Sequence, residues 1–213
     1  MLERNILIID DNRRVKDIYV PTYRNRINCL KTASAKWVDY DFHIEHCAGM
    51  NAALDYLSDP SKIVDVLVVD YDFSTEARKP FENGTAFVEH VRKNINRHCE
   101  IIFYTMQGLS SIQAEEWAAL VNSDVYQLVD KSSDEIVLAD IIFEAATRRN
   151  PIVESLERFV IKYGSLLENY TYTFDGKIIA FDEIINHIRM DDDLGRMFVE
   201  KLLQKAILTS TEI

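Results

Sequence analysis

Five short, mostly apolar runs, four of them followed by polar side chains, constrain the fold of this chain more than any other feature. The runs occupy residues 4–9, 42–48, 64–69, 100–104 and 125–129. We predict buried strands there, because each run is short and is bounded by charged or turn-forming residues. Amphipathic segments predicted as helices separate them. Strands that alternate with helices are typical of an α/β fold with a doubly wound parallel sheet, here of five strands.

The connecting segments carry clear boundary signals. Helices are predicted over residues 13–37, 51–58, 85–95, 110–122 and 133–148. Pro21 is predicted to break the first of these into two pieces, since proline removes a backbone donor inside a helix. Residues 71–84 are predicted as a loop because they contain Ser74, Pro80, Asn83 and Gly84.

Polar side chains of related chemistry follow four of the five runs. In an α/β sheet the carboxyl ends of parallel strands meet at one edge, where ligands bind. The side chains expected at that edge are Asp10, Asp11, Asp70, Thr105 and Lys131. Three acids, one hydroxyl and one amine are suited to holding a divalent cation and a phosphoryl group.

These five positions, in this order, resemble the receiver domain of bacterial two-component response regulators over residues 4–148. The resemblance implies a flavodoxin-like fold and phosphorylation of Asp70 by a histidine kinase or a histidine phosphotransfer protein. A carboxylate can act as the nucleophile in such a transfer. Only self-phosphorylation and autodephosphorylation are then expected, so we do not predict an enzyme with a separate substrate.

The resemblance also implies Mg²⁺ as the cofactor. Asp11 and Asp70 would be direct ligands, Asp10 would act through water, and the backbone carbonyl of Asp72 would be a further ligand. Mg²⁺ prefers such oxygen ligands and offsets the repulsion among carboxylates. Thr105 and Lys131 would contact the phosphoryl oxygens, because phosphoryl transfer depends on positioning and charge neutralisation.

Three positions near the predicted site differ from the usual receiver pattern. Met106 stands where a small residue is usual, Leu128 where an aromatic residue is usual, and Ser132 where proline is usual. The loop from Asp70 to Gly84 is also several residues longer than usual. A second hypothesis is therefore a pseudo-receiver, an interaction scaffold that acts without phosphorylation.

A phosphatase is the third hypothesis. Asp70-Tyr71-Asp72 after an apolar strand also resembles the first motif of haloacid-dehalogenase-like phosphatases, in which the second acid is a general acid. However, no GDxxxD element follows Lys131, and the Asp10-Asp11 pair has no counterpart in that family.

The C-terminal part reads as a separate small α+β domain. Asn150-Pro151 marks the predicted boundary, because Asn caps helices and Pro suits their first turn. We therefore predict domains over residues 1–149 and 150–213. The second would contain helices over 151–168, 181–190 and 194–208 and a hairpin within 170–181, where Asp175-Gly176 supplies the turn.

The partners of this domain are not specified by its sequence. It has more acidic than basic residues and no clustered basic face, so we predict an unknown protein partner rather than DNA. Helix 151–168 carries an apolar stripe of Val153, Leu156, Val160, Tyr163 and Leu167, which permits either a homodimer or packing within its own domain. We favour packing.

Composition excludes several classes of function. A net charge of −11 argues against binding of nucleic acid by the whole chain. No apolar run approaches the roughly 20 residues that span a membrane. The widely spaced Cys29, Cys47 and Cys99 indicate reduced thiols in a cytoplasmic protein.

Basic residues are nevertheless concentrated near the N-terminus. Seven of them lie within residues 12–37: Arg13, Arg14, Lys16, Arg24, Arg26, Lys31 and Lys36. They could form a docking face for the acidic surface of a phosphodonor, or simply a solvated helix face. Both interpretations remain open at this point.

Overall fold

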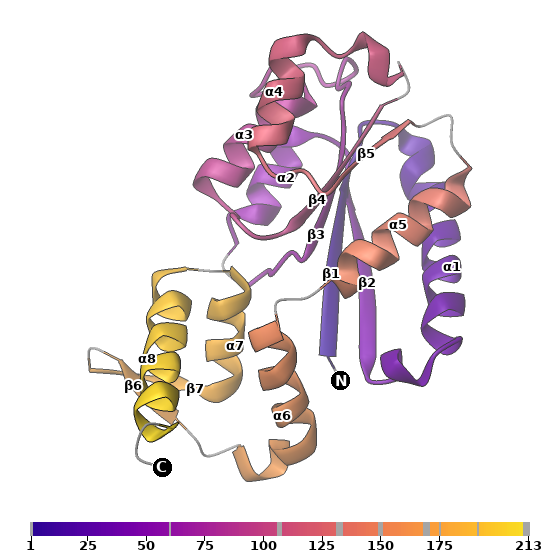
Figure 1. Cartoon of the computed structure of the whole chain (residues 1–213). Coiled ribbons are helices and arrows are strands. Elements are labelled where there is room, and N and C mark those ends of the chain that lie inside the picture. Colours follow the sequence, from indigo (N-terminus) through magenta and orange to yellow (C-terminus); the bar gives the residue numbers. More distant parts are fainter. Residues whose placement is uncertain are drawn as a thin grey trace. The chain divides into compact units, whose positions relative to one another are not determined.

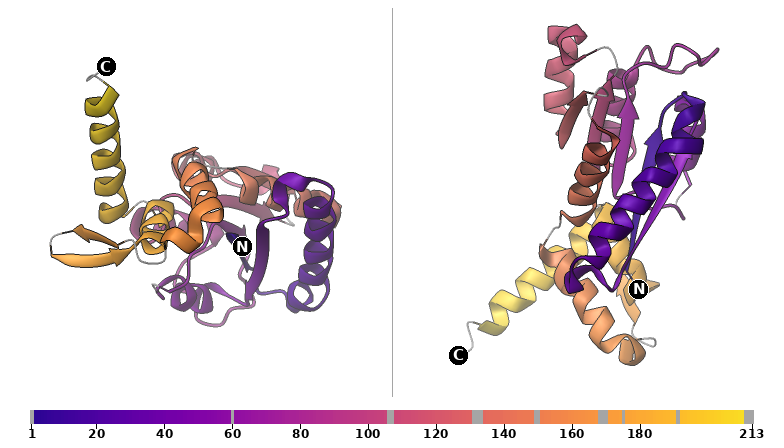
Figure 2. Two further views of the ribbon diagram at one scale, coloured as in Figure 1. Left: turned by 90° about the horizontal axis from the view of Figure 1, so that it is seen from below. Right: turned by 90° about the vertical axis from the view of Figure 1, so that its right-hand side faces the viewer.

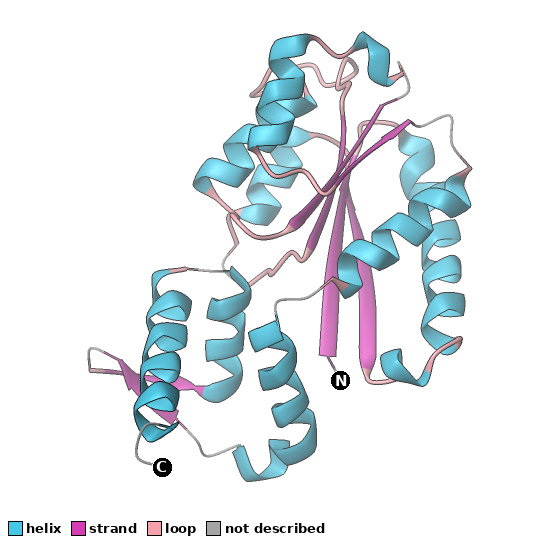
Figure 3. Ribbon diagram, viewed as in Figure 1, coloured by secondary structure: helices cyan, strands magenta, loops and turns pink. Residues whose placement is uncertain are grey.

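The computed structural model describes residues 2–59, 61–105, 108–130, 134–148, 151–167, 171–174, 176–190 and 192–210 (Figures 1 and 3). The chain forms two compact units, Met1–Arg148 and Arg149–Ile213. No helix in the described part of the chain is long and apolar enough to cross a membrane.

The first unit is built on a five-stranded parallel sheet. Its strands are β1 (Leu2–Ile9), β2 (Tyr40–Cys47), β3 (Val66–Asp70), β4 (Glu100–Thr105) and β5 (Gln127–Asp130). They are ordered β2-β1-β3-β4-β5. The predicted α/β fold is therefore confirmed. The order changes direction between β1 and β3, and in open α/β sheets ligands bind at such a switch point.

Helices cover both faces of this sheet. They are α1 (Val20–Thr32), α2 (Met50–Leu57), α3 (Gly84–Asn94), α4 (Ala114–Asn122) and α5 (Glu135–Thr147). Helices α1 and α5 lie side by side (Figures 1 and 2). Alternating residues of β1 show why two layers form: Ile6 and Ile8 pack in the cluster that includes α1 and α5, whereas Leu7 and Ile9 pack in the cluster that includes α2 and α3.

The region around Pro21 differs from the prediction. Proline does not divide the helix but lies in the first turn of α1, directly after a π-helical turn over Val15–Tyr19. A π-turn is wider than an α-helical turn, and such bulges accommodate irregularities in the hydrogen-bond ladder. The α-helix ends at Thr32, and a separate 3₁₀ turn follows over Ala35–Trp37.

The second unit contains helices and one antiparallel hairpin. Its elements are α6 (Pro151–Leu167), β6 (Thr171–Phe174), β7 (Lys177–Ala180), α7 (Phe181–Met190) and α8 (Asp193–Ser210). Its core consists of Val153, Ile179, Ile184, Ile188 and Phe198. Val153 and Leu156 of the predicted apolar stripe pack in this core. The predicted stripe residues Val160 and Leu167 lie outside the residues whose side chains are described.

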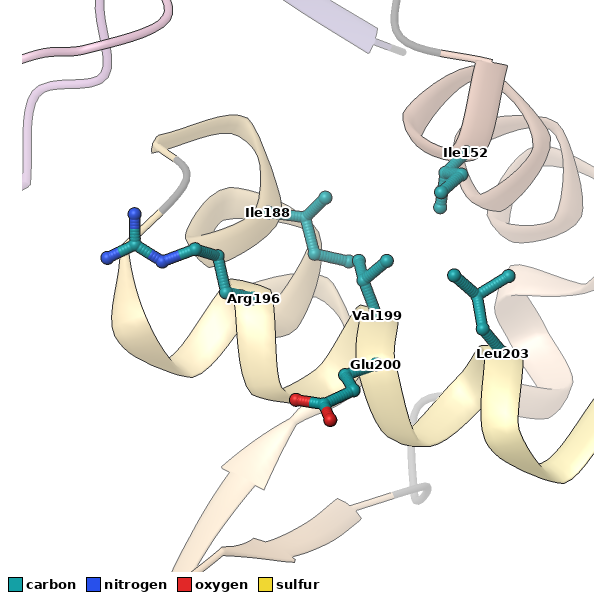
Figure 4. A pocket seen from close by; sticks show the side chains of 7 residues that line it. Ile152, Ile188, Arg196, Val199, Glu200 and Leu203 are labelled. Atoms are coloured by element: carbon teal, nitrogen blue, oxygen red, sulfur yellow. The ribbon is translucent and has the colours of Figure 1, made fainter.

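Helices α7 and α8 meet closely in this unit. A Cβ on Gly195 would lie 2.3 Å from the carbonyl oxygen of His187, so only glycine permits this approach. Next to the junction lies a pocket of about 300 Å³, shown in Figure 4. Its lining combines apolar side chains of α6, α7 and α8 with the charged groups of Arg196 and Glu200.

Candidate functional site

Three carboxylates meet at the carboxyl edge of the first unit's sheet. Asp10 and Asp11 directly follow β1, and Asp70 is the last residue of β3. Strands β1 and β3 pair in parallel up to Ile9 and Val69, which brings the next residues together. One oxygen from each of the three carboxylates lies within 4.8 Å of the others. The structure thus joins three of the residues that the sequence placed at this edge.

The carboxylate of Asp10 is fully buried, with 0% of the residue exposed. Its Oδ1 accepts a hydrogen bond of 2.7 Å from the backbone N–H of Asn12, and its Oδ2 accepts one from the hydroxyl of Tyr104. The Asp10 carbonyl lies 2.9 Å from Nε2 of His46. Burial lowers the pKa of His46, although its contact with Asp10 opposes that shift. These contacts fix the orientation of the Asp10 carboxylate within the cluster.

Asp70 lies against the first turn of α3. Its Oδ1 accepts a hydrogen bond of 2.8 Å from the backbone N–H of Tyr71. A Cβ on Gly84 would come within 1.9 Å of the Asp70 carbonyl oxygen. Glycine is therefore required for α3 to begin where it does. The backbone N–H of Gly84 in turn donates to the Tyr71 carbonyl at 2.9 Å, which joins the two ends of the intervening loop.

The loop between β3 and α3 supplies contacts to two further acids. The carboxylate of Asp72 is bound within this loop, with a 2.9 Å hydrogen bond from the backbone N–H of Ser74. The backbone carbonyl of Asp72, the atom predicted as a metal ligand, stays a prediction. The carboxylate of Asp11 accepts two hydrogen bonds from Thr75, across a separation of 64 residues.

Thr105 ends β4, is 1% exposed, and pairs with Asp130 across the β4–β5 ladder. Lys131, Met106 and Ser132 lie outside the described residues, so the predicted role of the lysine stays a prediction. Leu128, the residue in place of the usual aromatic, is half-buried and packs against the cluster that includes α3 and α4.

Glu116 on α4 connects this helix to the residue next to Asp70. Its carboxylate accepts hydrogen bonds from the Tyr71 hydroxyl at 3.2 Å to both oxygens and from the side-chain amide of Asn83. It also accepts a 3.0 Å bond from the backbone N–H of Gln113, which caps α4. Helix α4 is therefore tied to both ends of the β3–α3 loop.

The sequence reasoning missed Tyr104, Thr75 and Glu116. Tyr104 could have been found, because a hydroxyl in a buried strand needs a hydrogen-bond partner. Nothing local marks Thr75 or Glu116, whose partners are brought close only by the fold. Burial raises the pKa of Tyr104 well above its ordinary value, and the nearby Asp10 carboxylate adds to that shift.

The donor set of the cluster fits a hard divalent cation. Carboxylate oxygens are the ligands that Mg²⁺ prefers, and one oxygen from each of the three acids lies within 4.8 Å of the others. Placing three carboxylates side by side, two of them buried, is costly, and a bound cation would offset their mutual repulsion. Asp10, Asp11 and Asp70 are thus the residues that would hold it.

No protein-family model matches the sequence, and no curated protein matches it. Among solved structures, a CheY-like response regulator receiver domain from Methanospirillum hungatei is 16% identical with a TM-score of 0.49, covering 68% of this chain and 94% of that one. The signal receiver domain of a putative Luxo repressor protein from Vibrio parahaemolyticus is 15% identical with a TM-score of 0.48. The match covers 75% of this chain and 98% of that one. The HemR receiver domain from Leptospira biflexa is 16% identical with a TM-score of 0.48. The match covers 70% of this chain and 98% of that one.

The strand order of the first unit and its helices on both faces are those of the flavodoxin-like arrangement that receivers adopt. The resemblance predicted from the residues is thereby confirmed at the level of the fold. The first unit of this chain has the fold of a response-regulator receiver domain.

Proposed function

We propose that this chain is a response regulator that accepts a phosphoryl group on Asp70 and signals through protein–protein contacts. The observation that carries the proposal is the convergence of the Asp10, Asp11 and Asp70 carboxylates within 4.8 Å at the switch point of the sheet. In this fold ligands bind at that edge. An acidic cluster at that edge can bind a divalent cation, and such a cation neutralises the charge of the phosphoryl group during its transfer.

The transfer itself would need little covalent chemistry from the protein. An oxygen of the Asp70 carboxylate attacks the phosphorus atom, the new P–O bond forms, and the P–N bond to a donor histidine breaks with its electron pair going to the imidazole nitrogen. The backbone N–H of Tyr71 fixes the orientation of the Asp70 carboxylate through its hydrogen bond to Oδ1. Mg²⁺, held by the three acids, would supply the neutralisation of charge. Thr105 and Lys131 are proposed to bind phosphoryl oxygens.

A histidine kinase or a histidine phosphotransfer protein is the proposed donor. Arg13, Arg14 and Lys16 directly follow the acidic pair and are exposed. The other four basic residues of the segment have contacts within the unit. Arg26 pairs with Asp140 at 2.6 Å, Lys31 lies 4.0 Å from Asp41, Arg24 donates to the Ile44 carbonyl, and Lys36 lies over the Trp37 ring. The proposed docking face is therefore limited to Arg13, Arg14 and Lys16.

The second unit is proposed as the module that meets a protein partner. Its acidic balance disfavours DNA as that partner. A homodimer through this unit remains a further prediction, which sedimentation of the full chain would test.

Phosphorylation by a small donor tests the proposal. The full chain is incubated with acetyl phosphate, with and without Mg²⁺, and its intact mass is measured. We expect a phosphate adduct that requires Mg²⁺, is absent from Asp70→Asn and persists in the matched control Asp72→Asn. A chain that gains no adduct from acetyl phosphate or phosphoramidate, and none from a cognate histidine kinase, would be the interaction scaffold. Turnover of a phosphomonoester that Asp72→Asn abolishes would identify the phosphatase instead.

A further inference from the structure

The loop between β3 and α3, residues 71–83, is firmly attached at several points. Phe73 is fully buried, and the Phe81 ring packs edge-on against Phe87 with centroids 5.8 Å apart. Such anchoring is unexpected for a surface loop of this length, since long loops are usually mobile unless they have a function. The position of the loop over the acidic cluster is thus defined by packing.

Glu76 attaches the middle of the loop to the N-terminus of α2. Its carboxylate accepts backbone hydrogen bonds from Met50 at 2.8 Å and from Asn51 at 3.2 Å. The side-chain amide of Asn51 returns a 2.7 Å bond to the Arg78 carbonyl. An anion at a helix N-terminus also interacts favourably with the helix dipole. This junction fixes the residue immediately before Glu76, which is Thr75.

Thr75 binds one oxygen of Asp11 with two donors. Its backbone N–H lies 2.9 Å from Oδ2 of Asp11, and its hydroxyl lies 2.6 Å from the same oxygen. The other oxygen, Oδ1, accepts no hydrogen bond from the described residues. Asp11 is therefore held by one oxygen while the second remains available to a cation.

We propose that Thr75 is a positioning residue for the divalent cation at the acidic cluster. Without it, the half-exposed Asp11 side chain would have to lose its rotamer freedom when the cation binds. Hydrogen-bond partners of ligating carboxylates typically contribute 10- to 100-fold to metal affinity. The long β3–α3 loop thus brings the hydrogen-bond donors of Thr75 to Asp11, the most exposed of the three acids. The inference rests on the proposed metal site and goes beyond it in assigning this role.

Direct measurement of cation binding tests the inference without phosphorylation. Mn²⁺, which shares the preference of Mg²⁺ for oxygen ligands, is titrated into the full chain, and free Mn²⁺ is followed by electron paramagnetic resonance, with Mg²⁺ as competitor. Thr75→Val removes the hydroxyl but keeps the shape and the backbone donor. We expect it to weaken binding about tenfold, the lower end of the usual range. The matched variant Thr75→Ser keeps the hydroxyl and should bind within about twofold of wild type, by the same reasoning.

Two further variants separate failure of the inference from failure of the metal site. Asp11→Asn and Asp70→Asn should each lose most of the binding. If they do, while Thr75→Val binds like wild type, the positioning role is wrong and the metal site stands. If they bind like wild type, the metal site itself is wrong. Circular dichroism without metal should show that both Thr75 variants are fully folded at the titration temperature, and an unfolded Thr75→Val would mean that the residue serves the fold instead.

Discussion

The hydroxyl of Tyr104 donates a hydrogen bond to Oδ2 of Asp10, linking β4 to the residue that follows β1. Tyr104 is 2% exposed and Asp10 is 0% exposed, so water does not satisfy either group. A buried carboxylate is tolerated only when it is hydrogen-bonded or paired. Tyr104 is thus part of what allows an acid to occupy the interior of this sheet.

Replacement of Tyr104 by Phe should destabilise the fold in the absence of metal. A hydrogen bond to a charged group contributes about 1.5 to 3 kcal/mol, and we expect a loss of that size in the free energy of unfolding in urea. Tyr23→Phe is the matched control, since Tyr23 is also buried and its hydroxyl forms no hydrogen bond with the described residues. Equal stabilities of the two variants would show that the bond to Asp10 contributes nothing.

Gly84→Ala should be more damaging than an ordinary substitution of glycine. Its Cβ would lie 1.9 Å from the Asp70 carbonyl oxygen, so α3 must move away from β3. We expect a loss of about 3 kcal/mol or more, as for other overpacked sites, and a lower yield of Asp70 phosphate. Gly176→Ala is the contrasting variant, because no atom lies within 4 Å of where its Cβ would be. Only the positive φ of 79° opposes a side chain there, and we expect a cost of about 1 kcal/mol in the free energy of unfolding. Similar losses in the two variants would argue against the close contact.

The stabilising effect of Asp140 should depend on pH. Arg26 hydrogen-bonds its carboxylate with N–O distances of 2.6 and 3.0 Å, which lowers the pKa of Asp140 below its ordinary value. The lower pKa in the folded state means that the stabilisation is complete above the unfolded value of about 3.9 and is lost as the pH falls through the folded value. Both side chains are 37% exposed, so the contribution is at most about 1 kcal/mol.

Urea denaturation of wild type and Asp140→Asn at several pH values measures this effect. The variant should be less stable at neutral pH, and the difference should disappear in strong acid. A difference that is the same at all pH values would show that the charge of Asp140 is not responsible.

Neutralising Arg13, Arg14 and Lys16 together to Gln should slow phosphotransfer from a histidine donor. These exposed cations adjoin the acidic cluster, and electrostatic attraction chiefly raises association rates, with the largest effect at low salt. The yield of adduct from acetyl phosphate, which needs no docking, should be unchanged. Neutralising Arg24 and Lys36, which have contacts within the unit, is the control. A rate that is unaffected at low salt would remove the docking role.

The features that could be predicted from the sequence are those encoded by local residue patterns. The apolar run before Asp10 and the one before Asp70 indicate buried strands, and the rule for parallel sheets then brings the acids together. Burial of Ile6 through Ile9 on alternating faces shows that the pattern reflects real packing. The glycine at position 84 could be read as a loop signal, but the reason for it, contact with Asp70, required the fold.

Other features depend on contacts between distant segments. Thr75 and Asp11 are 64 residues apart, and Tyr104 and Asp10 are 94 apart, so no local pattern connects them. The π-turn before Pro21 was missed because proline normally predicts a break. In each case tertiary packing decides between local alternatives that the sequence leaves open.

The most direct test of the central claim is to identify the residue that carries the phosphate. The chain is phosphorylated with acetyl phosphate and Mg²⁺, reduced with borohydride to convert any aspartyl phosphate to homoserine, and mapped by peptide mass spectrometry. We predict homoserine at position 70 and nowhere else. Homoserine at position 10, 11 or 72, or none at all, would contradict it.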